Sequence, residues 1–194
     1  SLQVAITAGA RDGETLEGGF LTHDGGTMNA GSVDPEDVGW VWIFTGIAVA
    51  QGTVLDSLPL WGYCRLTNAV NTDVIIRAQD TSSAADLTDA TDFYLRGFTT
   101  ASITRTYGSW TTGTWVYLGD FAAVVNEVLA RPDFTSGNSI GIWVNNNGTT
   151  GLNRKRLEQI DDGTARVVSG TLHWNGSPAG GDEIGCRRRV IGEL

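Results

Sequence analysis

Hydrophobic and polar residues alternate with a period of two along most apolar stretches of this chain. Val74, Ile76 and Ala78 fall on one face, for example, and Arg77 and Gln79 on the other. This is the pattern of a half-buried β-strand, whose successive side chains point to opposite faces. The same pattern predicts strands at residues 2–8, 58–66, 74–80, 99–107, 114–118, 140–145, 154–160 and 167–174.

The stretch 58–66 has two features of its own. The alternation turns Trp61 and Tyr63 away from the face that carries Leu60. Pro59 has no backbone N–H to donate, so it favours either an edge strand or the start of a strand here. Residues 40–45 differ, because they are apolar on both faces, which predicts a central strand covered on both sides.

One segment has the helical period instead. Its apolar residues recur at the i, i+3, i+4, i+7, i+8 spacing of a single helix face. They are Phe121, Val124, Val125, Val128 and Leu129. Asp120 is the predicted N-cap and Pro132 the predicted end of the helix. A lone amphipathic helix among strands has to bury its apolar face against a sheet.

Eight to ten short strands, one helix and 26 glycines against 4 prolines predict an all-β fold. We expect a two-sheet antiparallel jelly-roll sandwich with one short helix and terminal arms. Residues 1–37 are predicted to form a first strand and a loop or arm rich in glycine and acid, in which only Gly19 to Thr22 resembles a further strand. The sandwich spans 38–174, and 175–194 form a C-terminal tail.

Charge and hydropathy limit the partners. The formal net charge of −9 argues against nucleic acid, since phosphate binding needs a basic surface. No apolar run approaches the roughly 20 residues of a membrane helix. Cys64 lies in a strand-like run and is predicted to be a buried free thiol, while its spacing from Cys186 leaves their pairing open.

The sequence carries no pattern of a catalytic or metal site. His23 and His173 are the only histidines, and neither lies in a nucleophile or zinc motif. The acidic clusters at 34–37, 86–92 and 161–162 lack the spacing of a calcium loop and are interpreted as solvated turns. We therefore expect no enzyme activity, no cofactor and no metal.

Two groups of residues are candidates for binding. Arg187, Arg188 and Arg189 follow a Gly/Ser/Pro-rich spacer on an acidic protein, where they would either be solvated or grip an acidic neighbour. Trp61 and Tyr63, on the polar side of their strand, would either stack on sugar rings or pack in an interface.

Several motifs together resemble a jelly-roll domain of tailed-phage virion proteins and bacterial surface proteins, which is similar in shape to carbohydrate-binding modules. They are Thr99–Ile103, Trp110–Gly113, the helix, Arg131–Phe134, Ser136–Asn138, the basic strand Asn153–Arg156 and Thr171–Trp174. The resemblance covers residues 38–174.

The resemblance implies a structural protein of the virion. The first hypothesis is a capsid decoration or cement protein that binds the major capsid protein, other virion proteins or further copies of itself, with a trimer as one arrangement. Arg187, Arg188 and Arg189 would then hold the neighbour. The alternative is a glycan-binding module of a tail fibre or surface protein, with Trp61 and Tyr63 on the sugar.

Overall fold

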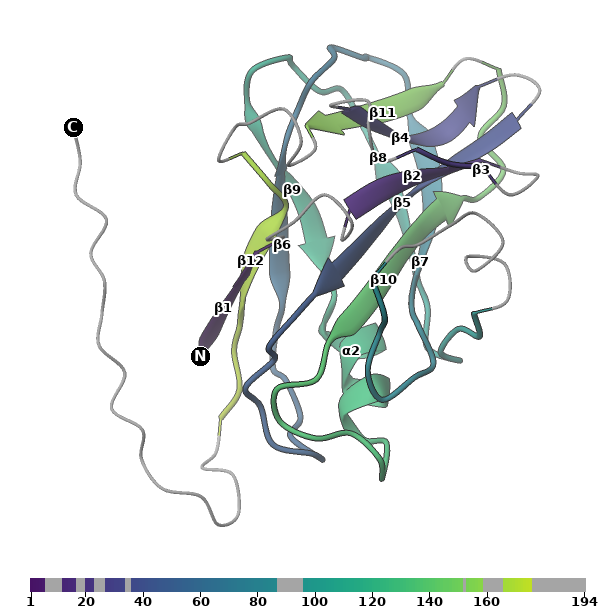
Figure 1. Cartoon of the computed structure of the whole chain (residues 1–194). Helices are drawn as coiled ribbons and strands as arrows, with labels where there is room; N and C mark the ends of the chain where they lie inside the picture. The colour runs from purple at the N-terminus through teal and green to yellow at the C-terminus, as the bar shows by residue number, and fades with distance from the viewer. Residues whose placement is uncertain are drawn as a thin grey trace, which may run out of the picture.

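The computed structural model describes residues 1–5, 12–16, 20–22, 27–33, 36–86, 96–151, 153–158 and 166–175. These residues form two antiparallel β-sheets that face each other, and a short helix lies at one end of the sandwich (Figure 1). The predicted all-β, two-sheet antiparallel fold with one short helix is confirmed for this part of the chain. Within it, no helix is long and apolar enough to cross a bilayer.

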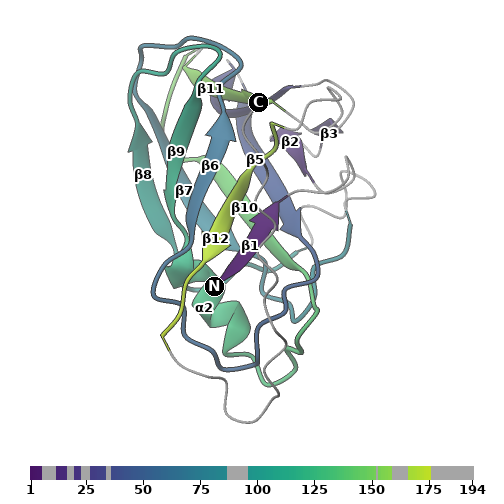
Figure 2. The same cartoon turned by 90° about the vertical axis from the view of Figure 1, so that its left-hand side faces the viewer.

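Sheet A is the smaller sheet, and Figure 2 looks onto its outer face. Its strands in spatial order are β1 (Leu2–Ala5), β12 (Ser169–Leu172), β6 (Pro59–Tyr63) and β9 (Trp115–Asp120). Pro59 is the first residue of β6, which is one of the two positions predicted for it. The other alternative, an edge strand, is wrong, because β6 pairs with both β12 and β9.

Sheet B holds the remaining described strands. Its main path runs β11 (Arg154–Glu158), β4 (Thr27–Val33), β5 (Glu36–Phe44), β10 (Ile140–Asn146), β7 (Thr72–Ala78) and β8 (Ile103–Tyr107). Off this path, β2 (Asp12–Leu16) pairs with β5 and with β3 (Phe20–Thr22). Before residue 36 the sequence indicated one strand beyond the first, at Gly19–Thr22, whereas the structure has β2, β3 and β4 there.

The core between the sheets is built around β5, which is buried from Val38 to Phe44, as predicted for a central strand. The ring of Trp40 stacks on those of Trp42 and Trp110, at centroid distances of 5.6 and 6.0 Å. Tyr107 packs against the same ring at 5.8 Å. Burial of these large rings contributes to the stability of the sandwich.

A second apolar cluster covers part of the outer face of sheet B. Trp143 on β10 is fully buried there with Val41, Ile43 and Ala84, and Phe98 packs against them. The half-buried pattern predicted for residues 140–145, in which Trp143 alternates with Ile142 and Val144, is therefore wrong for β10. Its alternation is that of an ordinary half-exposed strand, but the segments around Ala84 and Phe98 cover this face.

Helix α2 (Ala122–Leu129) closes one end of the sandwich in both views (Figures 1 and 2). The predicted apolar face is buried, with Phe121, Val124 and Val128 each at most 1% exposed. The N-cap position is Phe121, which makes no side-chain cap, and not Asp120, but the predicted hydrogen bond from the first helical turn to the Asp120 carboxylate is present. Asp120 still accepts hydrogen bonds at Oδ1 from the amides of Leu58 and Ala122 (2.8 and 3.0 Å), because β9 continues directly into the helix.

Candidate functional site

The outer face of sheet A carries four aromatic side chains in two cross-strand pairs. Trp61 lies opposite Tyr117, and Tyr63 opposite Trp115. The ring centroids are 5.2 Å apart in the first pair and 5.5 Å in the second. Trp61, Trp115 and Tyr117 are 44%, 46% and 41% exposed, although such rings are usually covered. We call these four residues the aromatic face.

A β-bulge sets this pairing. Leu60 pairs with Gly119, but the next residue, Trp61, pairs with Tyr117, so that Leu118 is the extra residue of β9. Gly119 has a φ of +138°, which a residue with a side chain rarely adopts. The bulge keeps Leu118 buried and turns Tyr117 outward beside Trp61.

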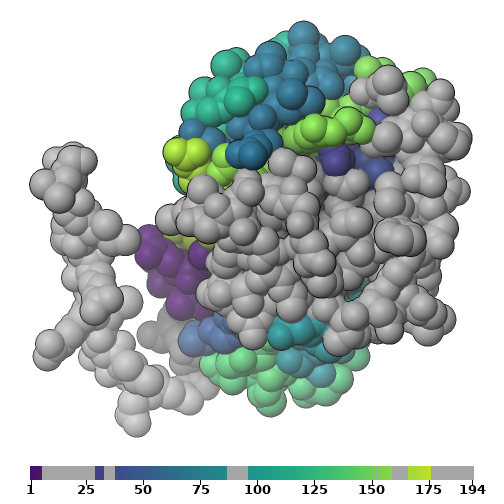
Figure 3. Space-filling view, turned by 45° about the horizontal axis from the view of Figure 1, so that its top comes forward, coloured from purple at the N-terminus to yellow at the C-terminus, as the bar shows by residue number. Residues whose placement is uncertain are grey.

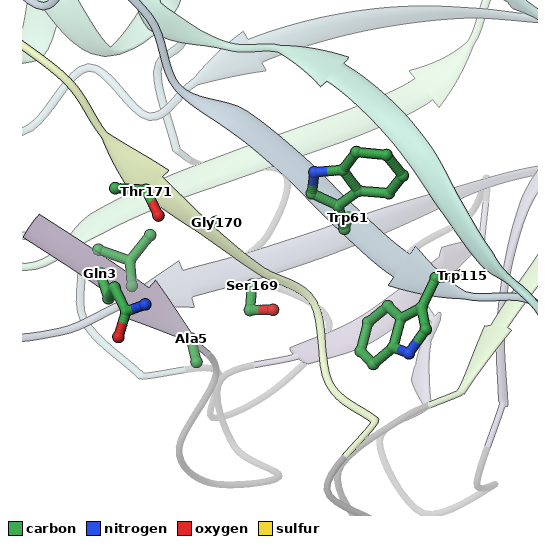
Figure 4. Close-up of a pocket in the computed structure, with 8 residues that line it drawn as sticks. Gln3, Ala5, Trp61, Trp115, Ser169, Gly170 and Thr171 are labelled. Carbon is green, nitrogen blue, oxygen red and sulfur yellow. The ribbon is translucent and has the colours of Figure 1, made fainter. Parts of the chain in front are cut away.

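A hollow of about 460 Å³ lies beside the aromatic face, over strands β1 and β12 (Figure 4). Trp61 and Trp115 line one side of it. The side chains of Gln3, Ser169 and Thr171 line the other side, together with β1 and β12 backbone. Two indole rings therefore face an amide and two hydroxyl groups across an open surface.

Two arginines contact the tyrosines of the aromatic face. Cζ of Arg105, on β8, lies 5.1 Å from the ring centre of Tyr117. Cζ of Arg166 lies 4.3 Å from the ring centre of Tyr63. Both distances are within the range of a cation–π interaction.

A buried carboxylate holds the second arginine. Oε1 of Glu158 lies 3.6 Å from Nη1 of Arg166 and 3.2 Å from Nη1 of Arg65. The Glu158 side chain is only 3% exposed, whereas the Arg166 side chain is 48% exposed, and this ion pair restrains Arg166 against Tyr63. One buried carboxylate thus faces two guanidinium groups.

The structure brings some of the predicted binding residues together and does not describe others. Trp61 and Tyr63 lie on the outer face of sheet A, as the alternation predicted, but Tyr63 is only partly exposed. The sequence reasoning missed Trp115 and Tyr117, although their alternation with Val116 and Leu118 was a signal for two further outward rings. The predicted Arg187–Arg189 site lies outside the described residues.

The buried groups elsewhere serve the fold. Cys64 is a buried free thiol, as predicted, and burial raises its pKa above the ordinary value. His23 and Cys186 lie outside the described residues. In the described part of the chain, no three His, Cys, Asp or Glu side chains gather closely enough to hold a metal ion.

Lys155 is a fully buried lysine that holds a loop in place. Its Nζ donates hydrogen bonds to the carbonyl oxygens of Asn68 (3.1 Å) and Val70 (2.6 Å) and lies 5.7 Å from the ring centre of Trp110. The β6–β7 loop (blue) and β11 (yellow-green) accordingly lie side by side in the space-filling view (Figure 3). Burial lowers the Lys155 pKa below its ordinary value of 10.5.

This shift gives a pH-dependent contribution to stability. Between the lowered pKa and 10.5 the unfolded chain binds more protons at Lys155 than the folded chain, so stability rises with pH there. Lys155→Met removes this dependence. We expect the free energy of unfolding of the protein with Lys155, relative to that of Lys155→Met, to increase in urea titrations as the pH rises toward 10.5. Both proteins should carry Cys64→Ala, because the charges of Cys64 and Lys155 affect each other's pKa. A difference that is constant with pH would contradict the prediction.

No family model matches this chain, and no curated protein matches it.

Proposed function

We propose that the chain is a glycan-binding module that holds a saccharide on the aromatic face of sheet A. The observation that carries this proposal is the hollow between Trp61 and Trp115 on one side and Gln3, Ser169 and Thr171 on the other. A sugar ring has an apolar C–H face and a rim of hydroxyl groups. Indole rings stack on such a face, and amide and hydroxyl side chains hydrogen-bond such a rim.

The composition of the surface distinguishes a saccharide from a purely apolar partner. Three large rings are each more than 40% exposed on neighbouring strands, and such a patch indicates a binding surface. The side chains of β1 and β12 beside it are polar or small, whereas the core of a protein interface is mostly apolar. Apolar rings beside polar side chains match the apolar face and hydroxyl rim of a saccharide. They match the mostly apolar surface of a protein partner less well.

The test is substitution of the two indoles that line the hollow. We expect Trp61→Ala and Trp115→Ala each to weaken binding of oligosaccharides found on a glycan array by more than roughly tenfold, because loss of a stacked aromatic at the centre of a site costs about 2 kcal/mol or more. Titration calorimetry with the hexasaccharide that binds best would measure the effect.

Val54→Ala is the matched control. Val54 is a 70% exposed apolar residue outside the aromatic face, so its removal should leave binding unchanged. Circular dichroism should show that all three variants stay folded. Absence of any glycan binding, together with a wild-type dimer or trimer that Trp61→Ala dissociates, would overturn the proposal and assign the aromatic face to contact between copies.

Attachment to a virion as a decoration protein stays a prediction. Its candidate residues, Arg187 to Arg189, are not among the described residues, and so no contact of theirs supports it. A glycan-binding module is compatible with a tail fibre or another surface location.

A further inference from the structure

Arg105 differs from the other described arginines because it has a buried side-chain nitrogen without a hydrogen-bond partner. It sits on β8 with its side chain directed toward the edge of sheet A. The buried Nε of Arg105 has no hydrogen-bond partner in the described residues, and no described carboxylate pairs with its guanidinium group. A partly buried, unpaired charge is unfavourable unless a further group satisfies it.

The fold makes room for this arginine. Gly119 lies at the bulge of β9, and a Cβ there would be 3.0 Å from Nη1 of Arg105. Tyr107 and Tyr117 hold the guanidinium between them, at 5.7 and 5.1 Å from Cζ to the ring centres. The cation is therefore fixed at the border of the aromatic face, next to the exposed Tyr117.

Few charged side chains of the described residues surround Arg105 on the aromatic face. The outward side chains of sheet A from Gln3 to Tyr117 are uncharged, and Arg166 lies against Tyr63 at the other aromatic pair. Asp120, at the end of β9, is already bonded by two backbone amides. On a protein with a net charge of −9, the aromatic face is thus contacted by two arginines, Arg105 and Arg166.

We propose that the saccharide bound on the aromatic face is acidic, and that Arg105 binds its carboxylate or sulfate group beside Tyr117. This inference rests on the proposed function and adds the charge of the ligand. The rings of Tyr117 and Trp61 stack on the sugar, while the guanidinium donates charged hydrogen bonds to the anionic substituent. Arg166 supplies a second positive charge for a longer acidic chain.

The experiment compares Arg105→Gln with wild type on three probes. These are a neutral hexasaccharide (cellohexaose), a carboxylated one (hexagalacturonate) and a sulfated one (chondroitin sulfate hexasaccharide). We expect the wild type to prefer one or both acidic probes, and Arg105→Gln to lose roughly 10- to 100-fold in affinity for them, as for loss of a charged hydrogen bond. Affinity for the neutral probe should change less than about threefold. The carboxylate and sulfate arms identify which anion is bound.

Arg77→Gln is the matched control. Arg77 also lies over an aromatic ring, that of Phe98, at 5.8 Å, but on the outer face of sheet B, away from the aromatic face. Its substitution should not change affinity for any probe. Arg105→Lys keeps the positive charge but loses the planar guanidinium group, so it should retain part of the affinity for the acidic probes. It provides a second variant if Arg105→Gln does not fold.

The outcomes separate this inference from the proposed function. Equal wild-type affinity for neutral and acidic probes, abolished by Trp61→Ala and unaffected by Arg105→Gln, would overturn the acidic ligand and leave the glycan-binding module standing. Equal losses in Arg105→Gln and Arg77→Gln would also overturn it, since the attraction would then be nonspecific. Binding of none of the probes or of any array glycan would overturn both.

Discussion

Trp40→Ala is expected to lower the free energy of unfolding by about 3 to 5 kcal/mol, which is the usual cost of removing a large aromatic side chain from a packed core. Trp40 is fully buried, and its ring contacts those of Trp42, Trp110 and Tyr107. Because these neighbours are held on β5, on β8 and in the connection that follows β8, they cannot all move to close the resulting cavity. Denaturation in guanidinium chloride, followed by circular dichroism, measures the change.

The matched control is the same substitution at the surface. Trp61→Ala removes a ring that is 44% exposed, so we expect a loss of less than about 2 kcal/mol. A domain of this size has a total stability of about 5 to 15 kcal/mol. If Trp40→Ala does not fold, Trp40→Phe should still fold and show a smaller loss. Equal losses from Trp40→Ala and Trp61→Ala would show that the described core is not the main source of stability.

The effect of Trp40 extends to the binding surface through Tyr107. The hydroxyl of Tyr107 donates a hydrogen bond to the carbonyl oxygen of Leu118 (2.8 Å), at the bulge of β9. Tyr107 thus links the core to β9, the strand that carries Tyr117. Its ring also contacts Arg105, which precedes Tyr107 by two residues on β8. A loosened core would therefore also disturb the edge of the aromatic face.

The elements predicted from the sequence are those in which the alternation or helical period of apolar residues matches which of their faces is buried. Strand β7 alternates because one of its faces is buried and the other partly exposed, and α2 shows a single apolar face because it covers one end of the core. The outward position of Trp61 followed from the same rule. In these cases, the burial of a residue depends on the period of its own element.

Other elements could not be predicted, because tertiary pairing decides them. Strand β2, Asp12–Leu16, has no apolar alternation, and its pairing with the buried β5 accounts for its strand conformation. Trp143 looked exposed by alternation, but distant segments near Ala84 and Phe98 cover it. Local propensity and pattern give way to tertiary contacts at such places.

The candidate site was predictable only in part for the same reason. The pairing of Trp61 with Tyr117 requires the bulge at Gly119, which no periodicity reveals. The hollow further requires Gln3 from β1 and Ser169 from β12, which come from opposite ends of the chain. Antiparallel pairing of β1 with β12 places them side by side.

Gly170→Ala is expected to lower the free energy of unfolding by about 3 kcal/mol and to weaken saccharide binding, because a methyl group does not fit at this position. A Cβ on Gly170 would overlap the carbonyl oxygen of Pro59 and lie 2.6 Å from Cδ2 of Leu60. The first of these atoms is backbone, so β12 has to move away from β6. Ser169, which pairs with Trp61, would move with it and alter the hollow. Denaturation and calorimetric titration with the best-binding hexasaccharide measure the two effects.

Gly108→Ala separates this clash from the general effect of replacing a glycine. The nearest atom to its Cβ would be Oδ1 of Asn71, at 4.0 Å, and neither glycine has a positive φ. Gly108→Ala should therefore be neutral or stabilise the fold by up to about 1 kcal/mol, through a less flexible unfolded chain. If Gly170→Ala proved as stable as Gly108→Ala, β12 would not approach β6 as closely as described. The hollow between Trp61 and Ser169, on which the proposed site depends, would then have a different shape.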